Sequence, residues 1–158
     1  HQWFYAVIGS DQVNQPWLDE GLTQLSNYVY YAGADGEATA AWFYGTLWDR
    51  WALVSYEKIP IGMRDFDYAG DSNGSAYRAI IYGRAALFLT LTPQDRAWPV
   101  KTQTLVDVMG QEEFDAFLRD YFQQHYFGVA TTESFKRLAE QHCECDLTAT
   151  FQEWVYQP

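Results

Sequence analysis

The amino-acid sequence predicts an all-α protein, on three observations. No run of residues alternates between apolar and polar for long enough to demand a β-strand, and no two such runs flank a turn dipeptide. Apolar residues instead recur every three or four positions, as Leu18, Leu22, Leu25 and Val29 do, which is the spacing of one face of an α-helix. Glycines and prolines fall between these periodic segments, where they end helices.

The first two helices are expected over residues 1–8 and about 16–31. A Gly-Ser pair follows the first segment and would end it. Asn14 can cap the second helix, and a proline is tolerated in its first turn. Gly33 follows the expected end of this helix and favours a stop there.

A third helix is expected over residues 36–56, with a proline and a glycine close behind it. Its apolar residues at helical spacing are candidates for burial. They are Trp42, Leu47, Trp51 and Val54.

Residues 61–75 are rich in Gly, Asp, Asn and Ser and are expected to form a loop. The helix expected next, over residues 76–91, is apolar nearly all round, which is typical of a buried helix. Gly83, Ala85 and Ala86 would let a neighbouring helix approach it closely.

Shorter helices are expected in the rest of the chain. One covers residues 102–109, and another begins near residue 114 and ends near residue 128. Thr131 or Thr132 caps a further helix, and a last short helix holds Trp154.

The composition indicates a single helical domain over residues 1–158. Of its 158 residues 48% are hydrophobic, and a chain of this length buries roughly two-thirds of its unfolded surface, enough for one core. Ten basic and twenty-one acidic residues give a net charge of −11, which argues against a nucleic-acid partner because phosphate binding requires clusters of Lys and Arg. The acidic balance favours solubility and would attract cationic peptides. No eighteen apolar residues follow one another, so no membrane span is expected.

Cys143 and Cys145 are expected to be free thiols near a helix end. One residue separates them, so that a disulfide between them would be strained, and two cysteines are too few for a structural zinc site. The cysteines therefore leave the cellular compartment open.

His1 and Glu20 have the spacing of two ligands of a catalytic zinc ion, because eighteen residues separate them. Such an ion takes three protein ligands, often two histidines and a carboxylate, and keeps one position for water. In the motif H-E-x-x-H the two histidines lie one helical turn apart and the Glu is the general base. From the spacing alone, Glu20 could also be a surface residue, since it shares the polar face of its helix with Gln24 and Asn27.

The runs HQWF at residues 1–4 and WLDEGLTQ at residues 17–24 resemble the aminopeptidase-N family of gluzincin metallopeptidases, whose usual forms are HExxHQWFG and WLNEGFA. The run YRAIIYGRAAL at residues 77–87 is similar to the family's Y-x-K-G-A segment, and this match makes Tyr82 the catalytic tyrosine that stabilises the tetrahedral intermediate. A weaker match covers residues 114–154. The resemblance implies the helical C-terminal lobe of a thermolysin-like zinc peptidase catalytic domain, with His1 and Glu20 as zinc ligands. In such a protease the loop expected over residues 61–75 would border the substrate cleft.

Other parts of the family pattern are not among these residues. The first histidine ligand, the general-base Glu and the exopeptidase segment G-x-M-x-N would lie upstream of His1. Asp19 stands where the family usually has Asn, and Gly83-Arg84 stands where it has Glu-Lys or Ser-Lys. We therefore expect a fragment of a zinc metallopeptidase, an aminopeptidase by resemblance. Its full-length parent would bind zinc and a peptide substrate, whereas the fragment alone would bind no catalytic zinc and be inactive.

Two other functional classes stay open. One is a non-catalytic helical interaction module derived from the same family, which would be favoured if the parent lacked the His-Glu pair before His1. The other is a sugar- or peptide-binding domain that uses its many Trp and Tyr residues for stacking. Apolar surface that the missing lobe would cover predicts a homodimer. The resemblance favours an extracytoplasmic or cell-envelope location, whereas the choice between exopeptidase and endopeptidase stays open.

Overall fold

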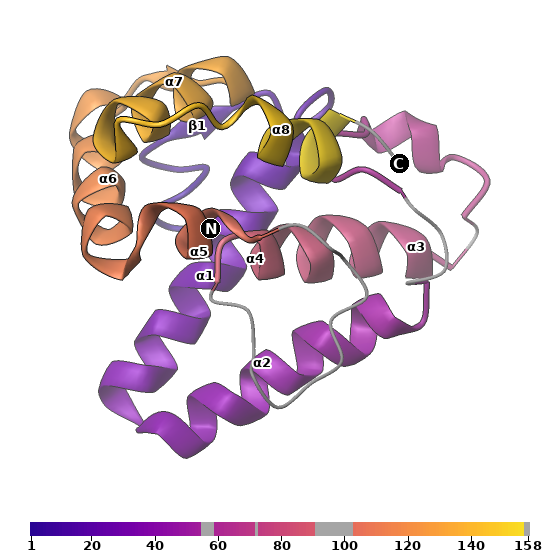
Figure 1. Cartoon of the computed structure of the whole chain (residues 1–158). Helices are drawn as coiled ribbons and strands as arrows, with labels where there is room; N and C mark the ends of the chain where they lie inside the picture. Colours follow the sequence, from indigo (N-terminus) through magenta and orange to yellow (C-terminus); the bar gives the residue numbers. More distant parts are fainter. Residues whose placement is uncertain (55–58, 72, 91–102, 157–158) are drawn as a thin grey trace.

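The computed structural model describes residues 1–54, 59–71, 73–90 and 103–156. These residues are mostly helical, which confirms the all-α prediction, and their two β-strands are only two residues long (Figure 1). The strands β1 (Gly9–Ser10) and β2 (Val129–Ala130) pair in parallel. The helices are α1 (Pro16–Ala34), α2 (Glu37–Ala52), the 3-10 helix η1 (Asp65–Tyr68), α3 (Ser75–Tyr77), the π-helix η2 (Arg78–Arg84), α4 (Ala85–Phe88), α5 (Leu105–Met109), α6 (Gln111–Gln124), α7 (Thr132–Cys143), α8 (Thr148–Phe151) and the π-helix η3 (Gln152–Tyr156).

Three packed groups of helices make up most of the architecture. Helices α1 and α2 form a long hairpin, and the continuous helical segment α3–η2–α4 packs against both of them (Figure 1). Helices α6 and α7 form a second pair, which Figure 1 shows on the other side of α1 from α2. No helix in the described part of the chain has both the length and the apolar character that crossing a membrane would require.

Residues 1–8, which we expected to be helical, form turns instead. The backbone N–H of Ile8 donates to the carbonyl of Trp3 at 3.1 Å, and Tyr5 has a positive φ of 92°. A helix of this length is marginal without tertiary support, because its first turn is costly to nucleate. Pairing of the following strand β1 with β2 gives the segment another way to satisfy its backbone.

Most helix boundaries follow the predicted signals, but α1 continues through Gly33 and ends at Ala34. Helix α1 begins at Pro16 as expected, but Gln15 takes the capping position, because the Asn14 side chain donates to Asp11 at 2.7 Å. Of the two threonines expected to cap α7, Thr131 does so, and its hydroxyl accepts from the backbone N–H of Ser134 at 3.1 Å.

Two apolar residues that we expected in the core are exposed. Leu47 and Trp51 of α2 are buried as predicted and Val54 is partly buried, but Trp42 is 64% exposed. Val29 of α1 is also exposed, although it continues the stripe of leucines on that helix. Both residues lie near the turn of the α1–α2 hairpin, which extends past the other helices (Figure 1).

Small residues let the buried segment α3–η2–α4 approach its neighbours, as predicted. A Cβ atom on Gly83 would lie 3.0 Å from the carbonyl oxygen of Leu47 in α2. From the α1 side, a Cβ atom on Gly21 would lie 3.0 Å from the Cβ of Ala85. These close approaches bring Tyr82, the residue before Gly83, next to the first turns of α1.

Arg84 ties the segment η2 to two distant parts of the chain. Its guanidinium donates to the carbonyls of Ile59 and Glu153 and lies 5.3 Å from the centre of the Trp154 ring. Burial lowers the pKa of Arg84 to about 10, so the group stays charged at neutral pH. This contact fixes the helix that carries Tyr82 against the C-terminal helices.

The expectation of free thiols was wrong, because Cys143 and Cys145 form a disulfide. The residue between them, Glu144, adopts the left-handed conformation with φ of 49°, which turns the chain back at the end of α7. The two Cα atoms then lie 5.1 Å apart, within the range that a disulfide requires. Spacing in sequence did not reveal this turn, since a left-handed Glu is uncommon.

Trp17→Ala is expected to lower the free energy of unfolding by about 3–5 kcal/mol, because it removes a fully buried indole. The ring lies 5.3 Å from that of Phe135 and 6.1 Å from that of Phe88, and its N–H donates to the hydroxyl of Thr132 at 3.0 Å. Urea unfolding followed by circular dichroism measures the loss. The matched variant Trp42→Ala removes an exposed indole and should change stability by about 0.5 kcal/mol or less. Equal losses in both variants would contradict the assigned core.

Candidate metal centre

The structure brings His1, Glu20 and Tyr82 together at one point. The Nε2 atom of His1 lies 3.2 Å from Oε2 of Glu20, and the hydroxyl of Tyr82 donates to Oε1 of the same carboxylate at 2.5 Å. A fourth residue, Asp19, joins them, since potential ligand atoms of His1, Asp19 and Glu20 all lie within 4.8 Å of one another. Within residues 1–54, 59–71, 73–90 and 103–156, no other group of three such side chains has this arrangement.

The first turn of α1 positions the two carboxylates. Trp17, Leu18 and Leu22 of this helix are buried, which fixes its rotation and leaves Asp19 and Glu20 directed toward His1. The prediction from sequence allowed Glu20 to lie on an exposed polar face. Its side chain is instead only 13% exposed, because the segment with His1 and the helix η2 cover it from two sides.

The residues around His1 are held by pairing with a distant segment. Gly9 donates to the carbonyl of Gly128 at 2.9 Å, and Phe127 donates to the carbonyl of Val7 at 2.9 Å. These bonds anchor the N-terminal turns beside the end of α6, so His1 reaches the first turn of α1 without being helical. The His1 side chain is 48% exposed, which leaves one side of the centre open to solvent.

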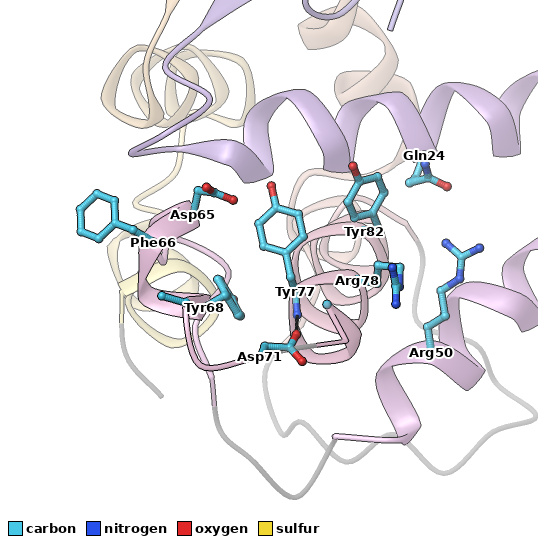
Figure 2. A pocket seen from close by; sticks show the side chains of 11 residues that line it. Gln24, Arg50, Asp65, Phe66, Tyr68, Asp71, Tyr77, Arg78 and Tyr82 are labelled. Carbon is cyan, nitrogen blue, oxygen red and sulfur yellow. Dashed lines mark hydrogen bonds between the residues drawn. The ribbon is translucent and has the colours of Figure 1, made fainter.

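Tyr82 reaches Glu20 from the π-helix η2, and Tyr77 lies beside it. The ring centres of the two tyrosines are 5.9 Å apart, and Figure 2 shows both hydroxyls pointing toward α1. Backbone bonds from residue i to i+5, such as Ala85 to Ile80, bring residues five apart closer to one face than an α-helix does. The sequence did not indicate that Tyr77 lies beside Tyr82, because no residue pattern indicates a π-helix. Single π-turns occur often at functional sites.

Asp19 orients the histidine ring. Its Oδ1 lies 3.2 Å from Nδ1 of His1, and its Oδ2 accepts from the Gln12 side chain at 2.6 Å. A carboxylate bonded to Nδ1 fixes the tautomer of the ring and leaves Nε2 free for a metal ion, an arrangement common around zinc. Asp19 appeared in the sequence only as a departure from a family pattern, and nothing there pointed to Gln12.

Burial raises the pKa values of the carboxyl and phenol groups at the centre. It raises the pKa of both Asp19 and Glu20, because the charged form of a carboxyl group loses solvation there. Burial, together with the hydrogen bond to Glu20, raises the pKa of the Tyr82 hydroxyl, and burial raises that of Tyr77 to about 12. Both phenols therefore keep their protons at neutral pH and act as hydrogen-bond donors.

The donor set at this point fits a zinc ion. Oε2 of Glu20 is buried and has no hydrogen-bond partner among the described residues, and the nearby His1 nitrogen supplies a second ligand atom. In a tetrahedral site with ligands at 2.0–2.2 Å from the metal, two ligand atoms lie about 3.3–3.6 Å apart. The observed separation of 3.2 Å between His1 Nε2 and Glu20 Oε2 is close to that spacing.

A cleft lies beside Tyr82, which is one of its lining residues. Its volume is about 1070 Å³, and residues of α1, α2, α3 and η2 line it together with residues between Asp65 and Gly74 (Figure 2). We predicted a loop over residues 61–75 that borders a cleft, and part of that segment, η1, is a short helix.

Comparisons of the chain with protein-family models, curated proteins and solved structures found no match.

Proposed function

We propose that this chain belongs to a zinc-dependent, aminopeptidase-like metallopeptidase, in which it forms the helical C-terminal lobe of a thermolysin-like catalytic domain. His1 and Glu20 would be zinc ligands, and Tyr82 would be the catalytic tyrosine. One observation supports this proposal. His1 from the N-terminal turns and Tyr82 from η2 both lie within hydrogen-bonding distance of the carboxylate of Glu20 in α1.

Each residue has a distinct role in the proposed hydrolysis. Zinc, when bound, polarises the scissile carbonyl and lowers the pKa of water. Tyr82 would donate a hydrogen bond to the oxyanion that develops from that carbonyl, for which its protonated hydroxyl is suited. Asp19 holds the His1 ring in the orientation that keeps Nε2 directed at Glu20.

The proposal requires a further ligand and a general base. The motif H-E-x-x-H places a second histidine four residues before His1 and a glutamate three residues before it, outside the printed sequence. We call a polypeptide in which residues with this motif precede the 158-residue chain the extended polypeptide. Zinc is proposed for this extended polypeptide, whereas the 158-residue chain by itself supplies too few ligands to retain a catalytic ion.

Hydrolysis of an aminoacyl anilide tests the proposal. The extended polypeptide should cleave the anilide, lose activity to a chelator and regain it with added zinc, because activity depends on the metal. The 158-residue chain, assayed in parallel, should be inactive. Chelator-sensitive cleavage by that shorter chain would contradict the ligand assignment, and an inert extended polypeptide would favour a non-catalytic interaction module.

Homodimer formation remains a prediction for the 158-residue chain. Large apolar side chains are exposed near the N-terminal turns and the end of α6, including Trp3, Tyr5, Tyr126 and Phe127. Contiguous apolar surface of a few hundred Å² tends to find a partner. Light scattering should give a mass that rises from monomer to dimer with concentration, and Phe127→Ser should weaken this rise. A monomeric mass at every concentration would rule the dimer out.

A further inference from the structure

The cleft beside Tyr82 has two arginines at one end, in a strongly acidic protein. The chain has a net charge of −11 and ten basic residues, and two of these, Arg50 and Arg78, line the cleft. They come from different helices, since Arg50 lies in α2 and Arg78 begins η2. Figure 2 shows both side chains at the end of the cleft where Tyr82 and Gln24 also lie.

Neither guanidinium is neutralised by a carboxylate of the described residues. Arg50 is exposed and makes no hydrogen bond or ion pair with residues 1–54, 59–71, 73–90 or 103–156. Arg78 donates to the backbone carbonyl of Asn73, a neutral acceptor. A guanidinium has five N–H donors, so most of the donors of both residues face solvent or the cleft.

The two acidic residues of the cleft, Asp65 and Asp71, form no ion pair with either arginine. Asp71 accepts from the backbone N–H groups of Ala76 and Tyr77 at 2.8 and 3.1 Å, and its other oxygen accepts from Ser75. Its carboxylate is therefore engaged at the start of α3. Asp65 lies at the opposite end of the cleft from Arg50 (Figure 2).

Aromatic rings form the wall between these ends. Tyr77 packs edge-on against Tyr68, with ring centres 5.2 Å apart, and against Tyr82 at 5.9 Å. Phe66, also on the wall, is half exposed. Rings of this kind contact the apolar parts of a peptide, whereas the arginines select a group with the opposite charge.

We propose that this cleft binds a carboxylate of a peptide, with Arg50 and Arg78 as the residues that select it. Tyr82 belongs both to the cleft and to the metal centre. The preferred substrates are therefore peptides with an acidic group close to the scissile bond, a statement that rests on the proposed function. A planar guanidinium pairs with a carboxylate through two parallel hydrogen bonds, which an amide cannot match. The carboxylate can come from an Asp or Glu side chain or from a peptide C-terminus.

Three small peptides separate these sources by direct binding to the 158-residue chain without metal. Acetyl-Tyr-Glu-amide carries a side-chain carboxylate, acetyl-Tyr-Gln carries a terminal carboxylate, and acetyl-Tyr-Gln-amide carries none. Titration followed by NMR chemical shifts gives each dissociation constant. At least one acidic peptide should bind about tenfold or more tightly than the neutral one, since hydrogen bonds between charged groups are the stronger kind.

Variants assign the preference to the two arginines. Arg50→Gln should lower the affinity for the acidic peptide toward the affinity for the neutral one. Arg78→Lys should lower it only in part, because lysine keeps the charge without the paired donors. Arg119→Gln, which removes an exposed positive charge on α6, is the control and should keep the preference. Equal affinities for all three peptides, or a preference that survives Arg50→Gln and Arg78→Lys, would overturn the proposal.

This test is independent of the metal centre. Acidic preference in a chain whose extended form neither binds zinc nor cleaves peptides would support the cleft and reject the metallopeptidase. Zinc-dependent hydrolysis without a preference for acidic peptides would support the metallopeptidase and reject the cleft as a carboxylate site.

Discussion

Glu20→Gln is expected to abolish the zinc-dependent activity of the extended polypeptide. The substitution keeps the size of the side chain and an oxygen that can accept from Tyr82, but it removes the negative charge of a proposed ligand. Zinc affinity should fall by more than the roughly 10–100-fold loss that follows removal of a partner outside the ligand shell. Titration with a competing chelator measures the affinity, and anilide hydrolysis measures the activity.

Variants of Asp19 give the matched comparison. Asp19→Leu removes the group that orients His1, so zinc affinity should fall by about 10–100-fold. Asp19→Asn keeps an oxygen that accepts from the Nδ1–H group and should lose much less. Zinc affinity that is as high in Glu20→Gln as in the unchanged protein would exclude Glu20 as a ligand, provided that circular dichroism shows both to be folded.

Tyr82→Phe is expected to lower kcat by about 100- to 1000-fold, the usual loss when one donor to an oxyanion is removed. Zinc affinity should also fall, by up to the roughly 10–100-fold loss that follows removal of a partner outside the ligand shell, because the phenol donates to Glu20 but supplies no ligand atom in the proposal. Assays at saturating zinc should therefore still show the full loss of kcat, and for every substrate.

A second tyrosine variant controls for the loss of a hydroxyl group. Tyr31 packs on Phe43, with ring centres 5.2 Å apart, near the turn of the α1–α2 hairpin and away from the metal centre. Tyr31→Phe should keep kcat within about twofold, since surface changes away from special features have small effects. An unchanged kcat in Tyr82→Phe, or a loss explained by missing zinc, would refute the role given to Tyr82.

Helices with strong local signals could be predicted from the sequence. Pro16 marks the start of α1, Thr131 caps α7, and the continuous apolar character around Ile80 and Ile81 predicts a buried helix. These signals are local, because each depends on residues within one or two helical turns. Tertiary context decided the rest: Trp42 is exposed because its part of the hairpin has no neighbour that covers it among the residues that the structure describes.

The N-terminal turns show the same limit for longer-range pairing. Residues 1–8 adopt turns, and β1 after them pairs with β2 more than one hundred residues later in the chain. The left-handed Glu144 allows a disulfide between Cys143 and Cys145 that sequence spacing argued against. Neither a pairing between such distant segments nor a single left-handed residue leaves a periodic pattern in the sequence.

For the candidate centre, the resemblance singled out His1, Glu20 and Tyr82, and the structure places these side chains together. Their roles in binding metal and in catalysis remain proposals. The sequence did not predict the contact between Asp19 and His1, because the non-helical path of the first residues determines it. Nor did it predict the pair of arginines in the cleft, which depends on the packing of α2 against η2.

Anomalous diffraction at the zinc edge, from crystals of the extended polypeptide, tests the central claim most directly. A single strong peak should lie about 2.0–2.2 Å from both Nε2 of His1 and an oxygen of Glu20, on the side that the Tyr82 hydroxyl faces. A zinc peak with neither side chain among its ligands, or the absence of zinc at this point from an active enzyme, would contradict the account.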